Sequence, residues 1–239
     1  MRPAALIFDV DGTLAETEEL HRRAFNAAFK EAGLNWVWDC SSYGDFLRTT
    51  GGKERIAAYA NSVGTKAIDI STLHRRKTEI YRAMMASTKL ELRPGVKRLI
   101  DIAYKQSIRM AIATTTTRSN VDALIAATLG GRVENWFSSV RCGEDVTHKK
   151  PHPEVYERVL RDLSIPPDQC WAFEDSRMGL QAALAAGVPT VVTPSLYTQT
   201  DDFSGATLIL RDLATPYSAV VSRGQAQLAA VPGPLLALL

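Results

Sequence analysis

Two aspartates follow an apolar run close to the start of the chain. Asp9 and Asp11 come directly after residues 4–8, Ala-Ala-Leu-Ile-Phe, and are followed by Gly12 and Thr13. Side chains alternate across a strand, so residues two positions apart point to the same side. Two neighbouring carboxylates repel each other unless a cation lies between them or one of them holds a proton. The pair therefore suits either a hard cation such as Mg²⁺ or a nucleophile beside a general acid/base.

Three further groups of polar residues stand where an apolar run ends or a helix is expected to begin. Thr114 ends the run Ile112-Ala113, Lys150 precedes residues 151–153, Pro-His-Pro, and Glu174 and Asp175 follow an apolar run that ends at Phe173. A lysine supplies a fixed positive charge for an anionic group, and paired acids supply oxygen ligands for a metal. Each group also has a structural interpretation. The threonine can simply end a β-branched strand, and the acids can cap a helix.

The second half of the chain predicts the elements that position these groups. From residue 92 onward, apolar runs alternate with helical patterns. The expected strands are residues 108–113, 139–141, 171–173 and 188–193, and the expected helices begin near residues 96, 120, 155 and 177. Strand-helix alternation of this kind favours a parallel sheet. In open α/β sheets the site lies at the carboxyl ends of the strands, where these polar groups are expected.

Residues from about 17 to 91 interrupt this alternation. They predict helices over residues 18–31, 53–62 and 71–86, without a strand. The densest basic stretch of the chain, His74-Arg75-Arg76-Lys77, falls in the last of these helices. We interpret it as a solvated helix face.

The four polar motifs resemble, in order, those of the haloacid dehalogenase-like (HAD) phosphohydrolases, whose first motif is Asp-x-Asp-x-Thr. They span residues 9–176. The resemblance implies an α/β fold with a Rossmann-like parallel sheet core and an inserted helical cap. It divides the chain into a core of residues 1–16 and 92–215, a cap of residues 17–91 and a C-terminal tail of residues 216–239. The tail either packs on the core or is disordered.

The resemblance also implies a covalent mechanism with Mg²⁺ as the cofactor. Asp9 would attack the phosphoryl group and form an aspartyl-phosphate, while Asp11 would protonate the leaving oxygen and then activate water. The ion would be held by a carboxylate oxygen of Asp9, the backbone carbonyl of Asp11 and Asp175. Glu174 would either bind the ion directly or orient its water ligands.

The phosphoryl group itself would be bound by Thr114, the backbone N–H of Thr115 and Lys150. We choose Lys150 over the lysine before it because Lys150 immediately precedes the Pro-x-Pro sequence. His152, where family members often have a small residue, is expected to start the helix. Two further residues of the predicted substrate-binding set follow the same strand end, Thr116 and Arg118.

Two segments of the cap are similar to one subgroup, the CbbY-type phosphatases. These relatives of β-phosphoglucomutase remove a phosphate from xylulose 1,5-bisphosphate, an inhibitor of the Calvin-cycle carboxylase. The segments are residues 14–21, Leu-Ala-Glu-Thr-Glu-Glu-Leu-His, and residues 49–56, Thr-Thr-Gly-Gly-Lys-Glu-Arg-Ile. The resemblance implies a sugar bisphosphate substrate. Phosphoglycolate phosphatase and β-phosphoglucomutase activities are the alternatives, and a non-catalytic phosphometabolite-binding protein is the alternative of another class.

A bisphosphate needs a second anion site, and the second cap segment offers one. A helix that starts at a Gly-Gly pair presents free N–H groups, a favourable dipole end and, here, two cations. The residues expected at this site are Thr50, Gly51, Gly52, Lys53 and Arg55. In the first segment, Glu18 is expected to bind sugar hydroxyls. His21, one turn later, either binds substrate or has a buried structural role.

Composition excludes several classes of function. The chain has 239 residues, a net charge of +2 and 46% hydrophobic residues, and it lacks the long basic run that marks nucleic-acid or membrane contact. Cys40, Cys142 and Cys170 are few and far apart, which favours a reducing compartment over a disulfide framework. We expect a cytoplasmic protein without a signal peptide or membrane span. We also expect a monomer that binds a small phosphorylated sugar and neither nucleic acid nor membrane.

Overall fold

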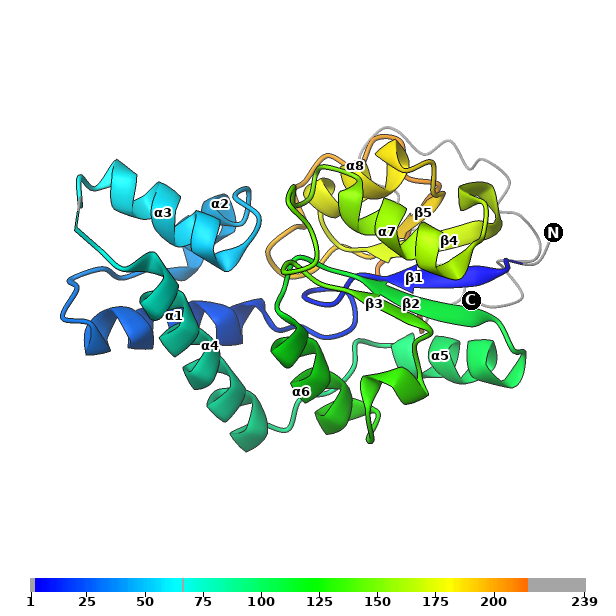
Figure 1. Cartoon of the computed structure of the whole chain (residues 1–239), viewed down its shortest axis with the longest axis horizontal. Coiled ribbons are helices and arrows are strands. Elements are labelled where there is room, and N and C mark those ends of the chain that lie inside the picture. The colour runs from blue at the N-terminus through cyan, green and yellow to red at the C-terminus, as the bar shows by residue number, and fades with distance from the viewer. Residues whose placement is uncertain (1–2, 66, 215–239) are drawn as a thin grey trace.

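A six-stranded parallel sheet forms the centre of the computed structural model, which describes residues 3–65 and 67–214 (Figure 1). The strands lie in the order β3 (Ser139–Arg141), β2 (Arg109–Ala113), β1 (Ala5–Phe8), β4 (Cys170–Glu174), β5 (Thr190–Val192) and β6 (Leu208–Ile209). The predicted α/β class is confirmed. Because β1 pairs with β2 on one side and with β4 on the other, three carboxyl ends meet at the middle of the sheet.

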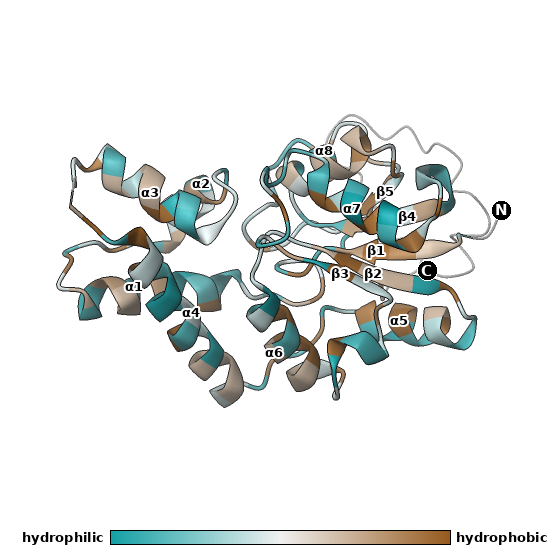
Figure 2. Ribbon diagram, viewed as in Figure 1, coloured by the Kyte–Doolittle hydropathy of each residue, from teal (hydrophilic) through white to brown (hydrophobic). Residues whose placement is uncertain are grey.

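Helices cover both faces of the sheet. α5 (Val96–Lys105) and α6 (Arg118–Thr128) pack on one face, and α7 (Glu154–Leu163) and α8 (Arg177–Ala185) on the other (Figure 1). A short 3₁₀ helix of residues Val133–Asn135 precedes β3, and another of residues Pro167–Gln169 precedes β4. Along β1, Leu6 and Phe8 join one apolar cluster, while Ala5 and Ile7 join the other. The strand is therefore apolar on both faces, and Figure 2 shows β1 in the brown shades of hydrophobic residues.

Four helices lie beside the carboxyl ends of the strands (Figure 1). They are α1 (Glu18–Glu31), α2 (Cys40–Phe46), α3 (Gly52–Ser62) and α4 (Ile70–Ser87). They bury a core of their own, which includes Phe25, Phe29, Trp38 and Ile56. Other buried residues of the group, among them Leu20, Tyr81 and Met85, join the apolar cluster on one face of the sheet. The domain boundaries at residues 16/17 and 91/92 stay a prediction, and the predicted tail of residues 216–239 lies outside the described residues.

In the part of the chain that the structure describes, one α-helix and one strand were not predicted, because each is too short to show a period. α2 buries only Tyr43, and it begins at Asp39, whose side chain accepts a hydrogen bond from the Ser42 N–H at 2.8 Å. β6 contains two half-buried residues at the edge of the sheet. Among the described residues, no helix combines the length and the apolar character that crossing a bilayer demands.

Candidate active site

The carboxyl ends of β1, β2 and β4 bring the predicted polar groups together. Asp9 follows β1 and its N–H donates to the Phe173 carbonyl of β4 at 3.0 Å. Thr114 follows β2, and its N–H donates to the Arg141 carbonyl of β3 at 3.0 Å. Continued backbone pairing beyond the strands fixes both residues at the same edge of the sheet. Asp9, Thr114 and Glu174 are all buried there.

Lys150 makes the central ion pairs of the site. Its Nζ atom lies 2.7 Å from Asp9 Oδ1 and 2.6 Å from Glu174 Oε1, and its side chain is 4% exposed. Burial lowers the pKa of Lys150, but the carboxylates of Asp9 and Glu174 raise it by more than burial lowers it. The net shift is upward, and the lysine stays charged. Lys149 instead pairs with Glu54 on α3. The structure therefore places Lys150, rather than Lys149, against Asp9.

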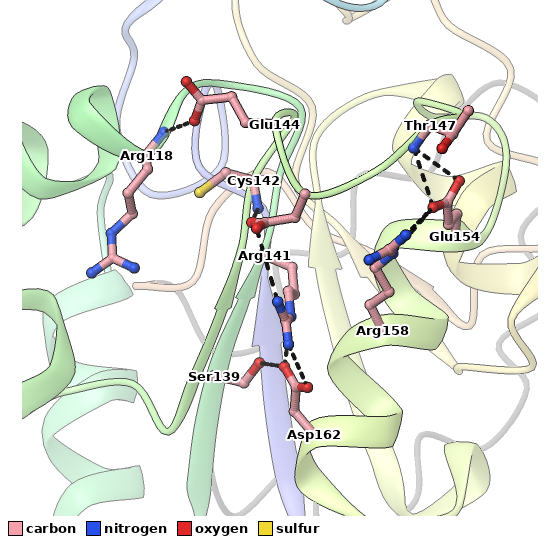
Figure 3. Close-up of polar contacts among 10 residues, drawn as sticks. Arg118, Ser139, Arg141, Cys142, Glu144, Thr147, Glu154, Arg158 and Asp162 are labelled. Atoms are coloured by element: carbon pink, nitrogen blue, oxygen red, sulfur yellow. Dashed lines mark hydrogen bonds and ion pairs between the residues drawn. The ribbon is translucent and has the colours of Figure 1, made fainter.

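The loop between β3 and α7, which carries Lys150, forms hydrogen bonds near both of its ends (Figure 3). At its start, the Cys142 N–H donates to Asp145 Oδ2 at 2.7 Å. At its end, Glu154 accepts from the Thr147 N–H at 3.2 Å and from Arg158 at 2.7 Å. Fixing both ends of the loop limits the positions that Lys150 can take.

Three buried carboxylates form a group that fits a divalent cation. Ligand oxygens of Asp9, Glu174 and Asp175 all lie within 4.8 Å of one another. Burial raises the pKa of Asp9 to about 7, with a further rise from Glu174, although Lys150 opposes both. Burial and the neighbouring Asp9 raise the pKa of Asp175 well above its ordinary value. A bound cation would relieve this repulsion, and oxygen donors of this kind suit a hard ion.

Asp11 has a different environment, although it is only two residues from Asp9. Its Oδ1 atom accepts a hydrogen bond from Thr17 Oγ1 at 2.6 Å and lies 3.0 Å from His21 Nε2. Burial raises the pKa of Asp11, but His21 and Thr17 outweigh it and hold the pKa below its usual range. The pair thus contains one carboxyl group that resists ionisation without a cation and one that is kept ionised. Such a division is typical of carboxylates with distinct catalytic roles.

Lys77 corrects the interpretation of the basic stretch as a solvated face. Its side chain is buried, its Nζ atom lies 2.5 Å from His21 Nδ1, and it stands 4.4 Å from the centre of the Phe25 ring. Burial lowers the pKa of Lys77 to about 7. The helical spacing in the sequence indicates this burial, because Lys77 lies four residues from both Leu73 and Tyr81 on the apolar face of α4.

The contact between Lys77 and His21 has a consequence for Asp11. When the Lys77 amine donates to Nδ1, the imidazole proton resides on Nε2, which faces Asp11. The His21 ring is held flat against Tyr81, with ring centroids 3.9 Å apart. The helical group therefore provides Asp11 with oriented donors, and a buried role for His21 agrees with one of the two interpretations of this residue.

A cavity of about 950 Å³ connects the carboxylates with the start of α3. Most of the predicted site residues line it, from both the sheet and the helical group. They are Asp9, Asp11, Glu18, His21, Thr50, Gly51, Gly52, Lys53, Arg55, Thr114, Thr115, Thr116, Lys150 and Asp175. Glu174 lies behind Lys150 and is fully buried. The cavity can therefore hold a small ligand between two groups of charged residues.

Direct contacts close the helical group over the sheet. The Thr50 hydroxyl donates to the Lys150 carbonyl, and Lys149 pairs with Glu54. On another side, Tyr197 Oη lies 2.9 Å from Glu19 Oε2 on α1. The structure thus shows a closed arrangement, in which residues of both parts enclose the cavity.

The anion site predicted at residues 50–55 lies at the start of α3, but its two cations, Lys53 and Arg55, differ in how free they are to bind a ligand. α3 begins after Gly51, whose φ of +89° favours glycine. Lys53 is exposed and lines the cavity. Arg55 is engaged within the helical group, because its guanidinium donates to the Phe46 carbonyl at 3.1 Å and to Tyr43 Oη at 3.1 Å. Lys53 is therefore the more available cation.

Polar residues that the sequence analysis left unassigned support the predicted ones. Tyr43 donates to Glu18 Oε2 at 2.9 Å, and Tyr156 donates to Glu174 Oε1 at 2.5 Å. Asn120 Nδ2 donates to Thr116 Oγ1 at 3.0 Å. No local pattern identifies such residues, because each meets its partner only through the fold.

Two residues singled out in the sequence lie away from the cavity. Arg118 pairs with Asp122 at 2.9 Å and with Glu134, while its backbone N–H donates to Glu144; Figure 3 shows its guanidinium pointing away from Glu144. His152 is exposed, and its Nδ1 atom accepts a hydrogen bond from the Glu154 N–H at the start of α7. The position of His152 is the expected one for a helix-start residue.

Residues 6–193 match the haloacid dehalogenase-like hydrolase family. The chain belongs to this family, as its four motifs, parallel sheet and acidic site indicate together. It is 33% identical over 193 residues to the fructose-1-phosphate phosphatase YqaB of Escherichia coli, covering 80% of this chain and 96% of that protein. The chain is a phosphatase of the haloacid dehalogenase-like type.

Within the family, the chain is similar to CbbY proteins over about nine-tenths of its length. It is 52% identical to the protein CbbY of Rhodobacter capsulatus, covering 90% of this chain and 95% of the relative. A crystal structure of a mutant CbbY from Rhodobacter sphaeroides in complex with xylulose 1,5-bisphosphate is 44% identical, with a TM-score of 0.86 and coverage of 90% and 96%. The β-phosphoglucomutase of Clostridium difficile, at 18% identity and a TM-score of 0.74, shares the fold.

Proposed function

We propose that this phosphatase hydrolyses xylulose 1,5-bisphosphate through an aspartyl-phosphate, with Mg²⁺ as its cofactor. The main support is its likeness, over 90% of the chain, to a CbbY structure that contains this bisphosphate. The cavity agrees with such a substrate, because Lys150 lies at the carboxylate end and Lys53 lines the side of the helical group. Two separated cations suit a ligand with two phosphates.

In the proposed reaction, a carboxylate oxygen of Asp9 attacks phosphorus and the bond to the ester oxygen breaks. Asp11 gives its proton to that oxygen, which leaves as the sugar hydroxyl. Asp11 then takes a proton from a water molecule, whose oxygen attacks phosphorus and releases phosphate and free Asp9. Lys150, Thr114 and the Thr115 N–H bind the phosphoryl oxygens and offset their charge.

Asp9, the backbone carbonyl of Asp11 and Asp175 would hold Mg²⁺, with Glu174 either a ligand or a partner of its waters. When bound, the ion neutralises charge on the nucleophile and the phosphoryl group. Glu174 accepts the hydrogen bonds of Lys150 and Tyr156 at Oε1 alone, and its buried Oε2 has no hydrogen-bond partner, so that oxygen is available for either role.

Asp11 must gain a proton before it can act as the general acid. His21 and Thr17 favour the ionised carboxylate, which is the form that activates water. Donation of a proton requires a higher pKa, and an anionic phosphoryl group beside Asp11 raises it. Substrate binding would therefore favour protonated Asp11, the general acid. After Asp11 has given its proton to the leaving sugar, it would be the ionised general base.

The substrate-binding set of the proposal keeps all of its predicted members. Lys53 would bind the phosphate that is not transferred, and Glu18 would bind a sugar hydroxyl. The other members are His21, Thr50, Gly51, Gly52, Arg55, Thr115, Thr116 and Arg118. Arg118 would have to leave Asp122 and Glu134 to reach a ligand, and is therefore the weakest member. A monomeric, cytoplasmic enzyme completes the proposal.

The test is phosphate release from a panel of sugar mono- and bisphosphates, 2-phosphoglycolate and β-glucose 1-phosphate in Mg²⁺. We expect the highest kcat/KM with xylulose 1,5-bisphosphate. A higher value with phosphoglycolate would support that alternative activity. Conversion of β-glucose 1-phosphate to its 6-phosphate without net phosphate release would identify a mutase. No turnover of any ester would favour the non-catalytic binding protein.

The same assay tests the metal. Activity is expected to disappear in excess chelator and to return with Mg²⁺. Ca²⁺ is expected to inhibit, because it prefers more ligands at longer distances and would misplace the attacking oxygen of Asp9. Undiminished activity in chelator would contradict the assignment of Mg²⁺.

Lys53→Ala tests the second phosphate site. A charge-assisted hydrogen bond contributes about 1.5–3 kcal/mol, so kcat/KM for the bisphosphate should fall roughly ten- to a hundredfold. The matching monophosphate, xylulose 5-phosphate or 1-phosphate, whichever is hydrolysed, has no second phosphate to lose and should change little. Lys30→Ala on α1 removes an exposed cation outside the cavity lining and is the control. Equal losses with both substrates would place Lys53 at the reaction centre or in the folding of the helical group.

A further inference from the structure

Arg93 lies where the chain returns from the helical group to the sheet. Its N–H donates to the Leu14 carbonyl at 2.8 Å, so the two connecting segments lie side by side. Its side chain is only 9% exposed, although it pairs at 3.1 Å with Glu16, which is 46% exposed. The guanidinium therefore points into the protein, and the ion pair with Glu16 occupies only its Nε edge.

The rest of the guanidinium binds three backbone carbonyls from two loops. Nη1 donates to the carbonyls of Gly12 and of Thr193, the latter at 2.7 Å. Nη2 donates to the Pro194 carbonyl at 2.7 Å. Gly12 directly follows Asp11, whereas Thr193 and Pro194 follow β5. Arg93 thus joins the loop after β1 to the loop after β5, across a gap of about 180 residues in sequence.

Asp175 lies between these two loops. A Cβ atom on Gly12 would stand 2.2 Å from Asp175 Oδ2 and 3.1 Å from Ser195 Cβ, so the three residues are closely packed. The loop after β5 also binds Asp175 directly, because Thr198 Oγ1 donates to its carbonyl at 2.7 Å and accepts from the Ser195 N–H at 2.8 Å. A shift of either loop would therefore move Asp175 relative to Asp11.

We propose that Arg93 is a positioning residue of the phosphatase, which fixes the loop of Asp9 and Asp11 against the loop that supports Asp175. The inference deepens the proposed function and rests on its assignment of these aspartates. Arg93 does not touch the reacting atoms. An arginine suits this task because its planar group carries five N–H donors in a fixed arrangement, whereas a lysine presents its donors from one atom.

The experiment compares Arg93→Ala and Arg93→Lys with the wild type, using whichever phosphate ester the wild type hydrolyses. Misplacement of a catalytic group by about 1 Å can cost roughly 10²-fold in rate. We therefore expect kcat of Arg93→Ala to fall about thirty- to a hundredfold, with KM changed less than about threefold. Arg93→Lys should fall about tenfold, because it retains the charge but satisfies fewer carbonyls.

Two readouts separate positioning from a merely structural role. Added guanidinium ion should restore part of the activity of Arg93→Ala, whereas methylammonium at the same concentration should not. Mn²⁺ binding to the metal-free protein, followed by electron paramagnetic resonance, should weaken about tenfold, since residues behind metal ligands typically affect affinity by 10- to 100-fold. Arg109→Ala is the matched control, because Arg109 also donates to a carbonyl, that of Leu163, but at the opposite end of the sheet.

Wild-type kcat and Mn²⁺ affinity in folded Arg93→Ala or Arg93→Lys would overturn the proposal. Loss of the folded state in both variants, judged by thermal unfolding, would also overturn it, because Arg93 would then maintain the fold as a whole. If the wild type hydrolyses no ester, the proposed function fails, and Mn²⁺ affinity alone still decides whether Arg93 positions the carboxylates.

Discussion

Asp9→Asn is expected to abolish phosphate release, with a loss on the order of 10⁶-fold, as for removal of a nucleophile in other enzymes. An amide oxygen is a far weaker nucleophile than a carboxylate, and it cannot carry the phosphoryl group as a stable acyl phosphate. Lys150 would keep its contact with Glu174 at 2.6 Å, so the substitution leaves no buried cation unpaired. The measurement is single-turnover hydrolysis with excess enzyme.

The folded state should tolerate Asp9→Asn. Burial raises the pKa of Asp9 to about 7 in the metal-free protein, so ionised Asp9 costs stability as the pH rises through that value. A neutral asparagine removes this cost. The melting temperature at pH 8 in chelator should therefore equal or exceed that of the wild type. Asp168→Asn, which changes an exposed carboxylate before β4, is the control and should affect neither rate nor stability. Near wild-type turnover in Asp9→Asn would refute the covalent mechanism.

Asp11→Asn should slow the reaction by about 10²- to 10⁴-fold, the usual contribution of a general acid/base. Asparagine can still accept hydrogen bonds from Thr17 and His21, so the closed arrangement should survive. With a sugar phosphate, both protonation of the leaving oxygen and breakdown of the intermediate should be slow.

An activated ester separates the two roles of Asp11. The nitrophenolate of p-nitrophenyl phosphate leaves without a proton, so Asp11→Asn should release one equivalent quickly and then stall as the phosphorylated enzyme. Intact-protein mass spectrometry detects that species. Asp45→Asn, an exposed acid on α2, is the matched control. Rapid steady turnover of this ester by Asp11→Asn would assign activation of water to another residue.

Local sequence patterns predicted where the polar groups of the candidate site lie. The apolar run before Asp9 predicts a buried strand, and the alternation of later strands and helices predicts that other strand ends meet it. The four motifs then suffice for the family, because each occurs at an element boundary that the chain itself specifies. Lys150 could also be chosen over Lys149 from the sequence, because its position directly before the Pro-x-Pro sequence is a local property. α1 was predicted over its observed span for the same reason.

The tertiary structure decided the state of those groups. Asp9 and Asp11 are nearly identical in sequence context, yet one lies among carboxylates and the other meets donors from the helical group. Arg55 looks as available as Lys53 in the sequence, but its guanidinium is bound to the Phe46 carbonyl and the Tyr43 hydroxyl of α2. No local pattern marks Arg93, because the carbonyls that it binds lie up to 101 residues away.

The physical reason is the range of the forces involved. Helix and strand periods depend on neighbours within a few residues, so a linear sequence displays them. The pKa of a buried acid, and the partner of a buried lysine such as Lys77, depend on charge and desolvation summed over whatever the fold brings near. The distances between these groups are set only in the folded protein, where the sheet and the helical group enclose the cavity.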